Sequence, residues 1–220
     1  MSIEKIALNK LLCLFYAPNN LRIRMLRDDI RRSRPKLEDE NSEGGDFHTS
    51  FWSDAKKHAI NQADLYECTA VRVAAHPGRR RLYPELRDGF LTWFNERRRW
   101  HNEPLNPLAP PAKAQLPMDG LGVVKVESIL GVQSEPGFQR LVYPYFAEKP
   151  ALPDEGGRLG LWAMAEALKN HDPADMRVLD ILRSRTFAIA DNPLVGDEQE
   201  IFHHRYRVIL NEWNKLKEEY

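Results

Sequence analysis

The spacing of apolar residues predicts a mainly helical first half. Apolar side chains recur every three or four positions, which is the spacing of one face of a helix. Pro84 suits the first turn of the last of these helices, which ends at a run of arginines and Trp100. The segment Asp64–His76 fits a strand nearly as well as a helix. The predicted helices cover residues 3–16, 21–34, 50–62 and 84–100.

The second half mixes strand-like and helical patterns. The strand-like run from Val123 to Gly131 and the run from Arg140 to Phe146 flank turn residues, so they predict a hairpin. Pro144 lacks an N–H group, which places the second run at a sheet edge or a bulge. A helix over residues 157–170 and a buried strand over residues 177–182 are predicted to follow.

The last helix has the most regular pattern in the chain. Its apolar residues are separated by four, three, four, three and four positions and form one continuous seam: Phe202, Tyr206, Ile209, Trp213, Leu216 and Tyr220. Acidic residues at its start suit the positive end of the helix dipole. Such a seam serves either as part of the core or as a docking surface for a structural partner protein.

Five prolines in residues 102–120 divide the chain and make regular structure there improbable. We therefore expect a basic helical half over residues 1–101, a proline-rich connection over residues 102–120, and a small α/β half with the terminal helix over residues 121–220. The predicted fold class is α/β or α+β. The helical half packs on a small mixed sheet, and the two halves form one compact unit.

Composition indicates a folded, soluble protein. Of the 220 residues, 42% are hydrophobic and 29% are charged, which is ordinary for a globular domain. No run approaches the roughly 18 apolar residues that span a bilayer, and no signal-peptide pattern is present. Cys13 and Cys68 are far apart and unaccompanied, so we expect free thiols. These features predict a cytoplasmic protein without a membrane partner.

The net charge is zero, but the charge is unevenly distributed. Residues 1–104 hold 19 basic and 15 acidic residues, whereas residues 105–220 hold 13 basic and 17 acidic residues. Arginine matches phosphate geometry, and exposed aromatic rings stack on unpaired bases. The leading interpretation is a non-catalytic protein that binds nucleic acid or a protein partner through a basic surface made by Arg79, Arg80, Arg81, Arg97, Arg98, Arg99 and Trp100.

An alternative interpretation gives the arginines structural roles. Arginine at the carboxyl end of a helix is favourable through the helix dipole alone. Arg24, Arg27 and Arg31 form a stripe that either adds to the basic surface or pairs with nearby acids. No phosphate-binding loop, serine-nucleophile motif or His/Cys metal motif is present, so no metal or cofactor is predicted and the question of enzymatic activity stays open.

One acidic arrangement favours a second alternative. Glu127 lies in the first run of the predicted hairpin, and Glu148 and Lys149 follow the second run. Over residues 121–190, the order of elements resembles the core of the PD-(D/E)XK nuclease superfamily with a degraded active site. Glu127 stands where that family has Asp, and no residue separates Glu148 from Lys149. The resemblance implies a metal-dependent nuclease in which Glu127 and Glu148 bind Mg²⁺ and Lys149 assists.

Overall fold

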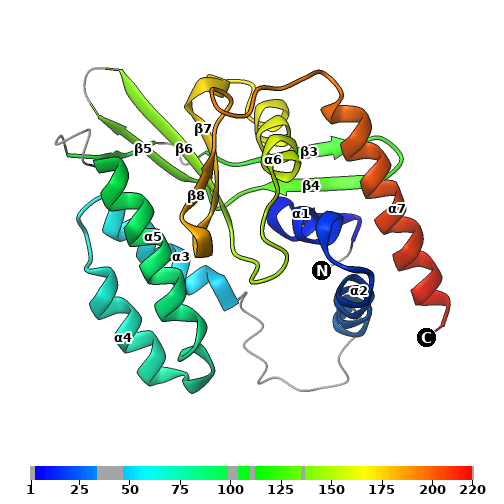
Figure 1. Ribbon diagram of the computed structural model, residues 1–220, viewed down its shortest axis with the longest axis horizontal. Helices are drawn as coiled ribbons and strands as arrows, with labels where there is room; N and C mark the ends of the chain where they lie inside the picture. The colour runs from blue at the N-terminus through cyan, green and yellow to red at the C-terminus, as the bar shows by residue number, and fades with distance from the viewer. Residues whose placement is uncertain (1–2, 34–46, 99–103, 110–111, 135–136, 220) are drawn as a thin grey trace.

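The computed structural model describes residues 3–33, 47–98, 104–109, 112–134 and 137–219 (Figure 1). The fold is α+β. The helices are α1 (Leu8–Tyr16), α2 (Asn19–Ser33), α3 (Phe47–Ala59), α4 (Leu65–Ala75), α5 (Leu82–Arg98), α6 (Asp154–Ala167) and α7 (Glu198–Glu218), with short 3-10 turns η1 (Pro77–Arg79), η2 (Pro173–Asp175) and η3 (Ile181–Arg183). The strands are β1 (Lys5–Ala7), β2 (Asn106–Pro107), β3 (Ala114–Met118), β4 (Gly122–Val126), β5 (Leu130–Ser134), β6 (Phe138–Tyr145), β7 (Met176–Asp180) and β8 (Arg185–Phe187).

The strands form two mixed sheets. One sheet has the order β1-β4-β3 and the other has the order β2-β5-β6-β7-β8. In the larger sheet, β6 and β7 are parallel, and α6 supplies the crossover that a parallel pair requires. The neighbouring pairs β5–β6 and β7–β8 are antiparallel.

Helices cover both faces of the larger sheet (Figure 1). Alternate side chains of β6 pack against the helices on opposite faces. Leu141, Tyr143 and Tyr145 point into a core that also contains residues of α1, α6 and α7. Val142, and Phe146 just beyond the strand, belong to a second core that contains residues of α3 and α5. Because side chains of a strand alternate between faces, a strand with apolar residues on both sides requires a layer of helices on each side.

Strand β6 is not an edge strand, contrary to the prediction, but Pro144 lies where the strand has a neighbour on one side only. Strand β6 lies between β5 and β7. The ladder between β5 and β6 starts at Leu130 opposite Val142, so Pro144 lies beyond the end of β5 and has only β7 beside it. The missing N–H group therefore interrupts no bond to β5.

The predicted hairpin is partly wrong, because the run Val123–Gly131 is two strands in two different sheets. Strand β4 pairs with β1 and β3, whereas β5 pairs with β6. Ser128 has a left-handed backbone (φ 64°) in the link between β4 and β5, and the Trp52 Nε1–H group donates a hydrogen bond to the Ser128 carbonyl. Glu127 consequently lies in this link, not on a strand.

The first predicted helix begins later than expected. Residues 5–7 form β1, which runs parallel to β4, and α1 starts at Leu8. The proline-rich segment also contains regular structure, because β2 and β3 fall within it. Pro107 and Pro117 lie on strands at the outer edges of their sheets, where a missing N–H group is tolerated. The ambiguous segment Asp64–His76 is helical and forms α4, with the Asp64 carboxylate accepting a hydrogen bond from the Glu67 N–H group.

The seam of α7 belongs to the core. Its members from Phe202 to Leu216 are at most 8% exposed, and the Tyr206 hydroxyl donates a hydrogen bond of 2.7 Å to the Ile3 carbonyl. Tyr220, the last member of the predicted seam, lies outside the described residues. The hypothesis of a partner that docks on this seam is therefore wrong for the described part, because the seam is already covered by the chain itself. Within the described ranges, no helix combines the length and the apolar character needed to cross a membrane.

Candidate functional site

An open cleft lies where the parallel strands β6 and β7 end. It has a volume of about 550 Å³ and is bounded by α5, by the segment after β6 and by η3 with the residue that follows it. The carboxyl ends of parallel strands are a common place for ligand sites in α/β sheets. The polar residues that line the cleft are Glu85, Asp88, Thr92, Glu148, Lys149, Arg183 and Ser184.

A close approach of α5 to η3 builds the floor of this cleft. A Cβ atom on Gly89 would lie only 2.1 Å from the Ile181 carbonyl oxygen, so the contact requires glycine. The Ser184 hydroxyl donates a hydrogen bond of 2.8 Å to the Gly89 carbonyl. Ser184 itself has a left-handed backbone (φ 52°), which turns the chain from η3 into β8. The floor is therefore fixed by backbone contacts.

Buried Asp180 and partly exposed Arg183 hold the two strand ends together. The Asp180 carboxylate accepts hydrogen bonds from the Leu152 N–H group (3.1 Å) and from the Arg183 guanidinium (3.1 Å). Burial raises the pKa of Asp180, although these two donors oppose the rise. Arg183 also donates to the carbonyls of Ala147 and Glu148, so its guanidinium is used within the fold.

An ion pair between Arg81 and Glu148 joins the arginine cluster 79–81 to an acidic residue of the nuclease alternative. The Arg81 guanidinium contacts both Glu148 carboxylate oxygens, at 2.5 and 2.7 Å. The hydrogen bond from Arg81 lowers the pKa of Glu148. The side chains are 65% and 43% exposed, and such exposed pairs contribute little to stability. An anion that reaches Arg81 can therefore exchange with Glu148 at small cost.

The other two residues of the first arginine cluster differ in their surroundings. The Arg79 guanidinium lies 5.2 Å from the centre of the Tyr83 ring. Arg80 is exposed and makes no ion pair with any described residue, and the same holds for Lys149 on the cleft wall. Glu148 and Lys149 line the cleft, Arg81 is bound to Glu148, and Arg80 precedes Arg81 in the chain, so we call Arg80, Arg81 and Lys149 the rim of the cleft.

The described parts of the two arginine clusters lie at opposite ends of α5. Residues 79–81 precede the helix and Arg97 and Arg98 end it, so its 17 residues separate their backbones by about 25 Å. The side chains of Arg97 and Arg98, and all of Arg99 and Trp100, fall outside the described residues. Trp93, one turn earlier, is 8% exposed and belongs to the core, so it offers no stacking surface.

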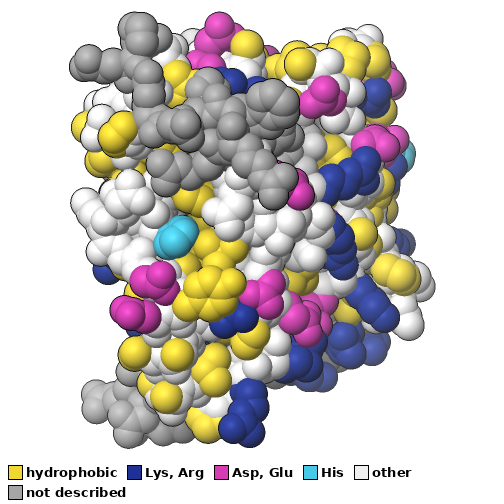
Figure 2. Space-filling view, turned by 60° about the vertical axis from the view of Figure 1, so that its left-hand side comes forward, with side chains coloured by type: hydrophobic (Ala, Val, Ile, Leu, Met, Phe, Trp, Pro, Cys, Tyr) yellow, Lys and Arg dark blue, Asp and Glu magenta, His cyan; other side chains and the backbone are white. Residues whose placement is uncertain are grey.

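The basic stripe of α2 is used mainly in ion pairs. Arg27 contacts Glu219 at 3.2 Å, and Arg31 contacts Asp28 at 3.3 Å. Arg24 is exposed and has no ion pair among the described residues. Basic and acidic side chains also lie near each other on the face shown in Figure 2. Lys and Arg side chains gather along its right side, with Asp and Glu side chains among them.

The residues of the nuclease alternative are only partly brought together. Glu148 and Lys149 line the cleft, whereas half-buried Glu127 is not among its lining residues. Within the described ranges, no group of three or more His, Cys, Asp or Glu side chains could hold a metal ion such as Mg²⁺. Glu148 is instead held by Arg81. The metal-dependent nuclease remains a prediction without a described metal site.

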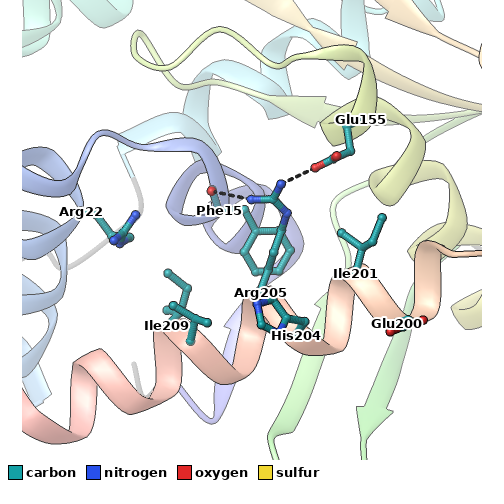
Figure 3. A pocket seen from close by; sticks show the side chains of 9 residues that line it. Phe15, Arg22, Glu155, Glu200, Ile201, His204, Arg205 and Ile209 are labelled. Carbon is teal, nitrogen blue, oxygen red and sulfur yellow. Dashed lines mark hydrogen bonds and ion pairs between the residues drawn. The ribbon is translucent and has the colours of Figure 1, made fainter.

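A second hollow, which the sequence analysis missed, lies between α7 and α1 (Figure 3). Its volume is about 510 Å³. Arg205 reaches from α7 and donates to Glu155 (2.5 Å) and to the Phe15 carbonyl (3.3 Å). The Tyr16 hydroxyl donates to the same Glu155 carboxylate at 2.7 Å, and Arg22 is paired with Glu212 at 2.7 Å. These charges neutralise one another, so the network clamps α1, α6 and α7 and leaves little net charge for a ligand.

The Glu155 network makes stability depend on pH. Burial raises the pKa of Glu155, but the hydrogen bond from Tyr16 and the charge of Arg205 outweigh it, so the folded pKa is lowered. A lowered carboxylate pKa gives stability that is complete above the unfolded value of about 4.3 and is lost as pH falls through the folded value. We expect Glu155→Gln to cost about 1 kcal/mol at pH 7, with the difference from wild type shrinking below pH 4.

Thermal unfolding between pH 7 and pH 3 measures this dependence. Glu200→Gln is the matched control, because Glu200 lines the same hollow but is exposed and makes no ion pair with a described residue. A constant difference between Glu155→Gln and wild type over this range would contradict the assigned role of Glu155.

Searches with family models, among curated proteins and among solved structures found no protein that matches this chain.

Proposed function

We propose that this protein binds nucleic acid without catalysing a reaction, through the basic side chains at the rim of the cleft. The observation that carries the proposal is the contact between Arg81 and Glu148, which brings the 79–81 cluster beside Lys149 from a distant part of the chain. Arg80 and Lys149 are exposed and make no ion pair among the described residues. Phosphate groups bind such cations and release counterions.

The charges that line the cleft favour contact at the rim. Asp88 is paired with Arg87 and Glu148 with Arg81, whereas exposed Glu85 makes no ion pair with a described residue. Its charge repels a phosphate inside the cleft, whereas Arg80 and Lys149 attract it. A backbone that follows the rim contacts Arg80 and Lys149 and competes with Glu148 for Arg81.

The test is a fluorescence titration of the full chain against short labelled single- and double-stranded DNA and RNA at low and moderate salt. Arg80→Ala/Lys149→Ala removes two rim charges. We expect it to weaken binding and to reduce the slope of log K against log salt by roughly 1.5. Arg24→Ala/Arg207→Ala is the matched control, because both are exposed arginines on α2 and α7 without ion pairs among the described residues.

Glu148→Gln separates this proposal from the nuclease alternative. The substitution releases Arg81 from its ion pair, so binding should tighten severalfold. In a metal-dependent nuclease, the same substitution would remove Mg²⁺-dependent cleavage. The proposal fails if the wild type does not bind at low salt, or if the control pair weakens binding as much as the rim pair does.

A further inference from the structure

Helix α4 presents a largely apolar face that the rest of the described chain covers only in part: the Arg87 guanidinium of α5 lies 4.4 Å from the centre of the Tyr66 ring. Of its eleven residues, only Leu65 and Thr69 are buried. Tyr66 is 56% exposed and Val71 is 67% exposed. These two side chains and three exposed alanines, at positions 66, 70, 71, 74 and 75, occupy about half of the helix circumference, and exposed Glu67 lies among them. Helix α4 lies at the outer side of the helical group, away from the sheets (Figure 1).

The orientation of α4 is fixed, so the apolar face cannot turn inward. On the opposite side of the helix, Arg72 donates to both carboxylate oxygens of Asp54 on α3, at 2.9 and 3.2 Å. The Asp54 side chain is only 5% exposed. Removing Arg72 would leave the Asp54 charge buried and unpaired, which is strongly destabilising. This ion pair and the Asp64 cap hold the apolar face toward solvent.

We propose that this face binds a second copy of the chain, with the two α4 helices antiparallel about a two-fold axis. The charges at the two ends of α4 are self-complementary. Asp64 and Glu67 make the first end acidic, and Arg79, in η1 just after α4, makes the second end basic. In an antiparallel pair, each acidic end lies beside the basic end of the other copy, and the helix dipoles also oppose each other.

The side chains along the face suit such a pairing. Ala70 and Ala74 let two helix backbones approach closely, and Val71 of one copy then packs against the small residues at the end of the other helix. Glu67 is exposed and makes no ion pair within the described chain, so it is available to the second copy. A helix of eleven residues is about 16 Å long and buries less than the standard interface of about 800 Å² per partner. The dimer is therefore weak and depends on concentration.

Sedimentation velocity of the full chain, from about 1 μM to 1 mM, tests the proposal. We expect a monomer–dimer equilibrium that Val71→Glu shifts at least tenfold toward monomer. Val208→Glu is the matched control, since Val208 on α7 is also exposed (39%) and should leave the equilibrium unchanged. Circular dichroism confirms that each variant is folded. A monomer at all concentrations, or a dimer that Val71→Glu does not weaken, overturns the proposal.

A charge exchange tests the antiparallel arrangement itself. Glu67→Arg and Arg79→Glu should each weaken the dimer, because each places like charges together at both ends of the pair. The double variant restores opposite charges and should regain most of the wild-type association. If the double variant associates no better than the single variants, the two-fold arrangement is overturned.

Discussion

Gly89→Ala is expected to lower the free energy of unfolding by about 3 kcal/mol. The added Cβ atom would lie 2.1 Å from the Ile181 carbonyl oxygen and 3.3 Å from the Leu182 Cα atom. These are backbone atoms, so no rotation of a side chain relieves the overlap, and α5 must move away from η3. The sign is informative, because alanine in a helix interior is otherwise more stable than glycine by roughly 0.5–1 kcal/mol.

Urea unfolding at pH 7 measures the effect. Gly78→Ala is the control, because a Cβ atom on Gly78 meets nothing within 4 Å. The control should change stability by less than about 0.5 kcal/mol. An unchanged or raised stability of Gly89→Ala would show that α5 and η3 do not approach each other as described. The cleft floor would then be wrong as well.

Phe202→Ala should cost about 3–5 kcal/mol, which is the largest effect expected for a single substitution in α7. Phe202 is fully buried, and its ring centre lies 5.1 Å from those of both Phe15 and Trp162. The substitution leaves a cavity where α1, α6 and α7 meet, and well-packed helices close such a cavity only in part.

Phe202→Ala also tests whether the α7 seam packs in the core of the chain or binds a partner protein. Thermal and urea unfolding of Phe202→Ala should show the loss, whereas Val208→Ala on the exposed side of α7 should change stability by less than about 0.5 kcal/mol. If Phe202→Ala left the stability of the isolated chain unchanged, the seam would be a docking surface after all. The structure predicts the opposite, because the seam is already buried.

Local periodicity predicted the helices well, and non-local pairing explains the errors. The seam of α7 repeats over five turns, so its position followed from the sequence alone. Strand β1 could not be recognised in this way, because residues 5–7 continue the apolar spacing of α1 and their partners are residues 123–125. The division between β4 and β5 likewise depends on Trp52, which bonds to Ser128 from another part of the fold.

The candidate site was predicted only in its residues, not in its arrangement. The sequence predicted a basic surface that includes Arg79, Arg80 and Arg81. It separately predicted a nuclease site that includes Glu148 and Lys149. Nothing in the sequence indicated that Arg81 and Glu148 bind each other. The sequence also suggested a continuous basic surface, but α5 separates its two clusters, and Arg27 and Arg31 of the α2 stripe are paired with acids. Ion pairs between distant segments have no local sequence signal.

The position of β1 has a consequence for synthesis of the chain. Residues 5–7 pair with residues 123–125, and the Ile3 carbonyl accepts a hydrogen bond from Tyr206, which lies 203 positions later. At 5–20 residues per second, the ribosome makes Tyr206 on the order of ten seconds or more after Ile3. Residues 3–7 are thus made well before the residues with which they pair. Until those residues are made, Ile3 and Ile6, which are buried in the folded chain, lack the cover that β4 and α7 give them.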